Sequence, residues 1–294
     1  MKDVLFIIMW FAMLYCQSQE TTTFIPDMNH ASADRRFLDD AKLIVKSADK
    51  VPEIVCIVNP TEQNSVECQW SLYLMSWLVH TGQFSTIYFD MDAFIAMLCD
   101  RYVRCERQVT SQDVEGYIWE YCKEFNINLT NMMMLLSGIR AYNEHSDNKV
   151  GIRGLNYDFN FLPFYDRPCH LIDSLISCAI GESSYKFTRD YLIKNEQKER
   201  VALGSSYDVY RRFFDLDRVH INMTKSLDSR MFDEFIYWHK QFDKGAKSIL
   251  FLSIWSMREV PDIPNFREGM KKNFRDNDYK IINLVDETIK HYPR

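Results

Sequence analysis

Five short runs of apolar, β-branched residues, separated by segments with helical periodicity, constrain the fold of this chain more than any other feature. The runs cover residues 54–58, 85–89, 149–155, 248–253 and 279–285. Strands that alternate with helical segments are typical of a parallel sheet with crossover helices. The sequence therefore predicts an α/β fold with a mainly parallel sheet and flanking helices.

The segments between these runs predict the helices. Trp70, Leu74, Trp77 and Leu78 recur at three- and four-residue steps, which gives one broad apolar helix face. Further helices are expected at 93–102, after Ser111 as an N-cap, at 131–144 and at 233–242. Residues 157–229 contain prolines, aromatics and charge clusters, and we interpret them as a mostly helical insertion on the sheet. Because no linker interrupts the pattern, residues 20–294 are predicted to form one domain.

Residues 1–19 are typical of a secretory signal peptide, with Lys2 before an apolar run and a short polar stretch after it. The run is shorter than the roughly 20 residues of a membrane-spanning helix. A buried N-terminal helix is the alternative, but no polar residue at helical spacing breaks the run. We therefore expect a secreted, extracellular product, and no later segment reaches membrane-spanning length.

The cysteine pattern agrees with an oxidising compartment. One of the eight cysteines, Cys16, would leave with the signal peptide, and most of the remainder are expected to form disulfides with at least one left over. Asn128 and Asn222 stand in glycosylation acceptor tripeptides. The remaining cysteines are Cys56, Cys68, Cys99, Cys105, Cys122, Cys169 and Cys178.

The charge balance argues against nucleic acid as a partner. The chain has 35 basic and 41 acidic residues, for a formal net charge of -6. No basic patch suggests a polyanion or an anionic membrane surface. Because no cysteine spacing fits a zinc site and no cofactor motif occurs, we expect neither a metal nor a cofactor.

Three blocks, taken in order, resemble the erythromycin esterase family of hydrolases. Residues 57–67 stand where that family has a strand and a Gly-Glu-x-x-His-Gly loop. Ile139-Arg140-Ala141-Tyr142-Asn143 and residues 149–156 are similar to the family's Arg-Ala-Tyr-Asn helix end and Gly-Phe-Asp strand end. Residues 230–256 stand where the family has Arg-x-Met-Ala-Glu-Asn and a Trp-Ala-His-Asn-x-His strand. The resemblance covers most of residues 50–290.

The groups that the family is expected to use to activate water are replaced in this chain. Pro60 and Gln63 stand at the positions of the opening glutamate and histidine, and Ser253 and Ser256 at the late-strand histidines. Neither proline nor glutamine can accept a proton near neutral pH, and a serine hydroxyl needs a separate base. Asn156 replaces the strand-end aspartate. The resemblance therefore implies a retained cleft without the family's general base.

Two residues of that functional set, Asp90 and Arg230, are kept. Asp90 and Asp92 end the second predicted strand, at the edge where open α/β sheets bind ligands, although Asp92 is equally suited to cap the next helix. Arg230 can bind an anionic group or pair with Asp233 on its own helix. Glu62 stands one place from the expected histidine and can serve as a base. A solvated loop carboxylate is the preferred interpretation of Glu62, because no partner that would tune its pKa is visible.

We therefore expect a secreted, erythromycin esterase-like pseudoenzyme that binds a small ligand or a protein partner in the family's cleft. The main alternative is an active hydrolase of an ester or amide, with a rebuilt site that uses Glu62 and Asp90. A third possibility is an interaction protein whose cleft is vestigial. The expected ligand-binding residues are Gln63, Asp90, Asn156, Arg230, Ser253 and Ser256.

Overall fold

A computed structural model of the 294-residue chain describes residues 51–59, 66–81, 83–106, 109–124, 127–157, 189–216, 227–253 and 266–283. Five strands lie in this part of the chain: β1 (Ile54–Asn59), β2 (Phe84–Asp92), β3 (Gly151–Asn156), β4 (Lys247–Ser253) and β5 (Tyr279–Asn283). The helices with assigned bounds are α3 (Val66–His80), α4 (Ala93–Val103), α5 (Ser111–Glu124), α6 (Leu129–His145), α10 (Glu196–Leu203), α11 (Ser206–Asp215), α13 (Leu227–Gln241) and α15 (Phe266–Asn273).

The strands form one sheet in the order β3-β2-β4-β1-β5, and every neighbouring pair is parallel. All five predicted strands are present, and the predicted α/β class with a parallel sheet is confirmed. The largest difference is at β2, which continues three residues past the predicted end at residue 89. The extension contains Asp90 and Asp92, whose charges do not fit an apolar run but whose carboxylates find partners inside the protein.

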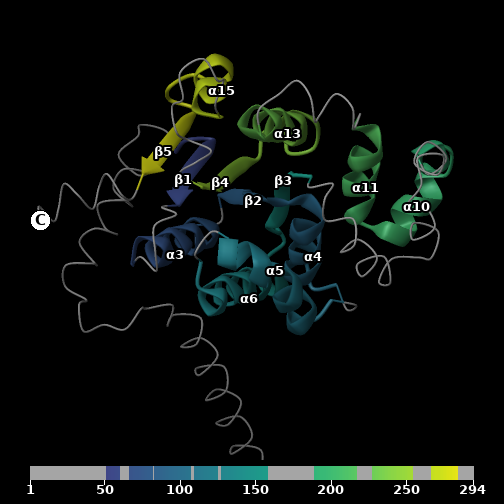
Figure 1. The fold of residues 1–294 in the computed structure, drawn as a ribbon, viewed down its shortest axis with the longest axis horizontal. Coiled ribbons are helices and arrows are strands. Elements are labelled where there is room, and N and C mark those ends of the chain that lie inside the picture. The colour runs from purple at the N-terminus through teal and green to yellow at the C-terminus, as the bar shows by residue number, and fades with distance from the viewer. Residues whose placement is uncertain are drawn as a thin grey trace, which may run out of the picture.

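Helices cover both faces of the sheet, as Figure 1 shows for α3, α5 and α6 on one side and α13 and α15 on the other. Alternate strand residues enter the two apolar cores, because successive side chains of a strand point to opposite faces. Val55 and Ile57 of β1 lie in the core with α3, α5 and α6, while Ile54 and Cys56 lie in the core with α11, α13 and α15. The β-branched runs are therefore buried on both sides, as expected for a parallel sheet.

Two helix starts test the predicted caps. The Asp92 carboxylate accepts hydrogen bonds from the backbone N–H of Phe94 at 2.8 Å and of Ile95 at 3.4 Å, so it caps α4. The predicted Ser111 cap of α5 is wrong, because Ser111 is already helical. Thr110 is the capping residue: its hydroxyl oxygen accepts from the Asp113 N–H at 3.3 Å, and the Asp113 carboxylate accepts from the Thr110 N–H at 2.8 Å. This reciprocal pair is a capping box.

The helix predicted at residues 233–242 also starts earlier than expected. The sequence pattern placed its start near residue 233, whereas α13 begins at Leu227. The added turn contributes Met231 and Phe232 to the apolar core. Within the predicted insertion, the described residues 189–216 contain α10 and α11, and the remainder of 158–226 lies outside the described residues.

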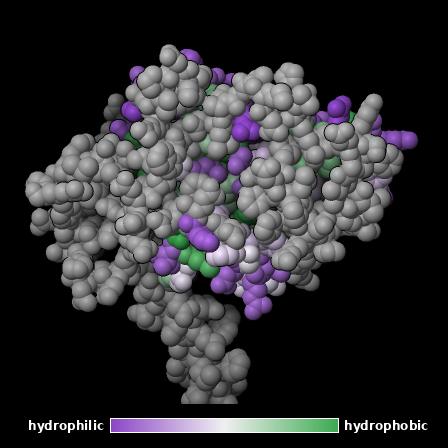
Figure 2. Space-filling model, in the orientation of Figure 1, coloured by the Kyte–Doolittle hydropathy of each residue, from purple (hydrophilic) through white to green (hydrophobic). Residues whose placement is uncertain are grey.

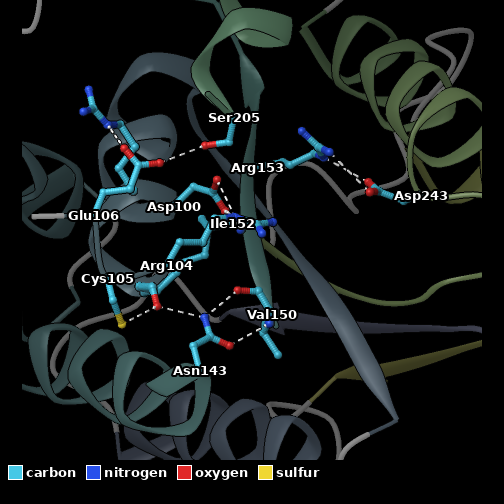
Figure 3. A network of polar contacts seen from close by, with 12 residues as sticks. Asp100, Arg104, Cys105, Glu106, Asn143, Val150, Ile152, Arg153, Ser205 and Asp243 are labelled. Atoms are coloured by element: carbon cyan, nitrogen blue, oxygen red, sulfur yellow. Dashed lines mark hydrogen bonds and ion pairs between the residues drawn. The ribbon is translucent and has the colours of Figure 1, made fainter. Parts of the chain in front are cut away.

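Buried polar side chains fix β3 against α4 and α6 (Figure 3). Asn143 of α6 is 1% exposed, and its side chain is hydrogen-bonded to the residue that directly precedes β3. Its amide nitrogen donates to the carbonyl oxygens of Val103 at 2.8 Å and Val150 at 2.9 Å, and its oxygen accepts from the Val150 N–H at 2.7 Å. Asp100 of α4 accepts from the Ile152 N–H at 2.8 Å and from Arg104 Nε at 2.9 Å.

An ion pair holds β3 to the chain that follows α13, and Figure 3 also draws it. Arg153 donates to the Asp243 carboxylate through Nε at 2.9 Å and Nη2 at 3.3 Å. The hydroxyl of Tyr88 on β2 donates to the same carboxylate. The Arg153 guanidinium lies 4.5 Å from the centre of the Trp238 ring, so it also makes a cation–π contact.

The described cysteines do not support the predicted disulfides. Cys56, Cys99 and Cys105 are free thiols, and the disulfide prediction is wrong for these three. Cys56 and Cys99 are enclosed by apolar side chains of the two cores, so they pack as small hydrophobic residues. Burial raises the pKa of the Cys56 thiol to about 12, which keeps it protonated and unreactive.

The surface of the described residues is mixed in polarity. In the orientation of Figure 2, hydrophobic residues reach the surface mainly in one small group bordered by hydrophilic ones. The exposed large hydrophobic side chains, which come from different segments, are Trp119, Met134, Ile193, Val201 and Phe242. Within the described ranges, no helix has both the length and the apolar composition needed to cross a bilayer.

A candidate ligand site at the carboxyl ends of the strands

The strand order creates a crevice at the carboxyl ends of β1, β2 and β4. The chain leaves β1 for α3 on one face of the sheet, and it leaves β4 for α15 on the opposite face. The adjacent connections therefore diverge. In open α/β sheets, ligands bind at such switch points. Asn59 and Ser253 end β1 and β4 in register with each other at this crevice.

Asp90 lies at this edge and is 6% exposed. One carboxylate oxygen accepts a hydrogen bond from the Tyr121 hydroxyl at 2.9 Å, and the other accepts from the backbone N–H of Ser253 at 2.6 Å. The carboxylate therefore ties the end of β2 to α5 on one side and to β4 on the other.

The electrostatics of Asp90 follow from burial. Removal from water raises the pKa of Asp90 from 3.8 to about 6, while the hydrogen bonds from Ser253 and Tyr121 act in the opposite direction. Desolvation disfavours the charged carboxylate more than these donors stabilise it. Asp90 therefore titrates close to neutral pH.

The pairing of β2 is irregular at Asp90, whose carboxylate reaches Ser253 at the end of β4. The pairing of β2 with β3 shifts between Phe89 and Asp92, which is where Asp90 lies. Bulges of this kind re-aim side chains and are common beside functional sites. Gly154 allows β3 to lie close to the junction of β2 and α4. A Cβ at this position would lie 2.7 Å from the carbonyl oxygen of Met91 and 2.7 Å from the Cα of Ala93.

The structure brings two of the predicted site residues into contact. Asp90 and Ser253 are hydrogen-bonded, and Asn156 ends β3 in register with Asp92. Arg230 lies in the first turn of α13, and its buried Nε has no hydrogen-bond partner. The other predicted residues, Glu62, Gln63, Ser256 and the glycosylation residue Asn222, lie outside the described residues. Asn128 is exposed and caps α6 through a 3.1 Å bond from the Asn131 N–H, and its glycosylation stays a prediction.

Sequence reasoning missed the role of Tyr121. The three- and four-residue spacing of Val114, Ile118 and Tyr121 indicates that Tyr121 lies on the inward face of α5, and its side chain is 4% exposed. Its hydroxyl is the feature that could have been noticed, because a buried tyrosine usually needs a hydrogen-bond partner. The identity of that partner depends on how α5 lies against β2.

A second polar cluster joins α11 to α13 beside the same edge. Arg212 binds both carboxylate oxygens of Glu234, through Nε at 3.0 Å and Nη2 at 2.5 Å. Its guanidinium also lies 3.9 Å from the centre of the Tyr237 ring. Burial raises the pKa of Glu234, while Arg212 opposes that shift. This pair attaches the described part of the insertion to the sheet-covering helix.

The described residues of this site can form hydrogen bonds and exchange a proton. Asp90 can hold a proton, and Ser253 and Tyr121 supply hydroxyl groups. Within the described ranges, no group of three or more His, Cys, Asp or Glu residues is arranged to hold a metal ion. The fold and this edge together define an α/β protein with a fully parallel sheet and a candidate ligand site at its topological switch point.

Comparison with solved structures gives matches in fold. A succinoglycan biosynthesis protein matches with a TM-score of 0.53 and 16% identity, over 84% of this chain and 68% of that one. A protein from Bacillus cereus matches with a TM-score of 0.51 and 16% identity, over 84% and 68% of the two chains. A mutant erythromycin esterase in its open conformation gives a TM-score of 0.45 and 14% identity, over 83% and 72%.

No protein-family model and no curated protein matches the sequence. At these identities, the similarity to solved structures concerns the fold. The likeness to the erythromycin esterase is distant.

Proposed function

We propose that this chain is a secreted, non-catalytic ligand-binding protein that holds a small ligand in the crevice at the carboxyl ends of β1, β2 and β4. The observation that carries the proposal is that the Asp90 carboxylate is buried and fully hydrogen-bonded within the protein. Both of its carboxylate oxygens accept hydrogen bonds from the protein, and the side chain is 6% exposed. A buried, doubly bound carboxylate is suited to holding the crevice in shape.

A general base must reach the proton that it removes, either directly or through one water molecule. Asp90 has little exposed surface from which to reach a substrate proton, and its carboxylate already accepts hydrogen bonds from the Tyr121 hydroxyl and from the backbone and side chain of Ser253. Serines, and not histidines, stand at positions 253 and 256 of the late strand and the residues after it. These features support a binding role over hydrolysis. Secretion is proposed from the composition of residues 1–19 alone.

A hydrolase with a rebuilt site is the second candidate, and one observation favours it. A pKa of about 6 for Asp90 lies in the range of a useful acid or base near neutral pH. In this version, Asp90 would act together with Glu62, which precedes α3 by a few residues.

The test compares turnover with binding in the same purified, secreted protein. Wild type, Asp90→Asn and Glu62→Gln are incubated with a panel of esters, lactones and amides, and the products are measured by mass spectrometry. The binding proposal expects no product from any of the three, together with ligand-dependent stabilisation in a thermal screen of metabolites. Hydrolysis by wild type that is lost in both variants would replace the binding proposal with the hydrolase.

The compartment is tested separately. Expression in a secretory cell line is expected to yield protein in the medium with a new N-terminus near Gln19, read by N-terminal sequencing. Full-length protein that stays inside the cell with Met1 intact would contradict secretion.

A further inference from the structure

Of the buried side-chain polar atoms that have no hydrogen-bond partner, two donors lie directly after β3 and in the first turn of α13. They are the hydroxyl of Tyr157 and the Nε of Arg230. Buried polar groups in folded proteins are nearly always paired, so each exception calls for an explanation such as an ordered water or a ligand. Both donors belong to the face of the sheet that α11 and α13 cover.

Tyr157 follows the last residue of β3, so it stands at the carboxyl edge. Its ring packs against Phe94 of α4, with centroids 6.3 Å apart, and against Phe213 of α11, with centroids 6.0 Å apart. Burial raises the pKa of Tyr157 well above its ordinary value, and the negative charge of Glu234 adds a smaller effect in the same direction. The phenol therefore stays protonated and offers a hydrogen to an acceptor.

Arg230 lies near the start of α13, four residues before Glu234. Residues spaced by four are neighbours on one helix face. Both carboxylate oxygens of Glu234 are bound by Arg212, whose neighbour in sequence is Phe213. The charges of Glu234 and Arg212 also act on the Tyr157 hydroxyl, so the pair lies near that group as well as near the first turn of α13.

The acidic groups around the two donors are already engaged. Glu234 is held by Arg212, and the Asp92 carboxylate caps α4. Neither is hydrogen-bonded to the Tyr157 hydroxyl or to Arg230 Nε. The missing partner is therefore an acceptor, and a negatively charged acceptor gives stronger hydrogen bonds than a neutral one.

We propose that Tyr157 and Arg230 bind an anionic group of the ligand, a carboxylate or a phosphate, at the α11 and α13 side of the crevice. This inference rests on the proposed ligand-binding function and names the chemical class of the ligand. The phenol donates one hydrogen bond, and the guanidinium adds a charge-assisted one. The Arg212–Glu234 pair holds α11 and α13 together behind the site.

The experiment measures anion binding directly, without turnover. Full-length wild type is titrated with inorganic phosphate and, separately, with citrate, at constant ionic strength set by sodium chloride. Binding is followed by the thermal midpoint and by NMR shifts of tyrosine labelled at the ring. Saturable stabilisation by one probe but not the other identifies the anion as phosphate or carboxylate, and either result supports the proposal.

Two variants test the named residues. Tyr157→Phe and Arg230→Gln are each expected to weaken the binding of the active probe about tenfold or more, while the unliganded protein stays folded. The matched controls are Tyr142→Phe on α6 and Arg200→Gln on α10, both expected to bind as wild type does. Arg230→Lys keeps the charge and is expected to recover part of the affinity.

Absence of any anion effect beyond sodium chloride would overturn this inference, because the two donors would then be satisfied by water. Equal binding by wild type and both variants would overturn it as well. Neither result bears on turnover, so failure of the anion site and failure of the binding function are read from different assays.

Discussion

The carboxylate of Asp90 on β2 accepts a hydrogen bond from the backbone N–H of Ser253 at the end of β4, with 2.6 Å between the oxygen and the nitrogen. These two strands are neighbours in the sheet although they are far apart in the chain. The bond joins the strand ends at the point where the connections diverge to opposite faces. Because a carboxylate forms it, its strength depends on pH.

We expect Asp90 to make the protein less stable as the pH rises from 4 to 7. The pKa of Asp90 is raised from 3.8 to about 6 by burial, so the folded chain binds more protons than the unfolded chain in this window. The free energy of unfolding must then fall with rising pH. A shift of about 2 units, at about 1.4 kcal/mol per unit, corresponds to about 3 kcal/mol.

Asp90→Asn removes this titration, and an asparagine can still pair with both Tyr121 and Ser253. Urea unfolding of wild type and variant between pH 4.5 and 7.5 is expected to show a smaller loss of stability in the variant. The exposed Asp147→Asn serves as the control and should follow wild type. Identical pH profiles for wild type and Asp90→Asn would show that Asp90 has no raised pKa.

Gly154→Ala is expected to destabilise the protein by about 3 kcal/mol or more, because the new Cβ would overlap backbone atoms that cannot move independently. Its closest contacts would be Met91 O and Ala93 Cα, each at 2.7 Å. Gly138→Ala is the matched control, since nothing lies within 4 Å of its Cβ position. In the interior of α6 that change should stabilise the protein by roughly 0.5–1 kcal/mol. Urea midpoints of both variants check the prediction, and equal effects would contradict the close approach at Gly154.

Asn143→Ala tests the amide that connects α6, α4 and β3. The change leaves the carbonyl oxygens of Val103 and Val150 and the N–H of Val150 without this partner. At about 1–3 kcal/mol for each of the three buried groups left unpaired, a loss of about 3 kcal/mol or more is expected. Asn131→Ala on the same helix should cost less than about 0.5 kcal/mol. Similar unfolding midpoints for the two alanine variants would show that the three hydrogen bonds add nothing to stability.

A double-mutant cycle tests the Arg153–Asp243 pair. Asp243→Ala leaves a largely buried guanidinium without its carboxylate and is expected to cost about 3–5 kcal/mol. Arg153→Met with Asp243→Ala should cost clearly less than the two single changes added together. The exposed pair Glu196–Arg200 provides the comparison, with a coupling of less than about 1 kcal/mol. Additive effects at Arg153 and Asp243 would rule out a coupled pair.

The strands could be predicted from sequence because burial on both faces of a parallel sheet leaves continuous apolar runs, as at Ile54 to Val58. Helix starts were less predictable. Thr110 and Ser111 are both good caps by residue type, and only the backbone conformation selects Thr110. The early start of α13 follows from the packing of Phe232 against Phe266, with ring centroids 5.2 Å apart, which is a tertiary contact.

The candidate site was partly predictable for a similar reason. Asp90 and Ser253 each end a strand, so the rule that parallel strands share one functional edge was enough to place them together. Tyr121 comes from a helix, and its hydrogen bond depends on the angle at which α5 crosses the sheet. The disulfide prediction failed at Cys56 because a rule about compartments contains no information on which cysteines lie inside a strand of the core.

The order of the strands has a consequence for how the chain acquires its structure. β4 fills the centre of the sheet, yet residues 247–253 are synthesised long after β1 and β2. Until then, β1 and β2 each present an unpaired strand edge, which is prone to association with other chains. Pairings so distant in sequence also slow folding, because a long loop must close first. A nascent chain that ends before residue 247 therefore needs a chaperone or rapid completion, and truncation before β4 should yield aggregates instead of a smaller folded unit.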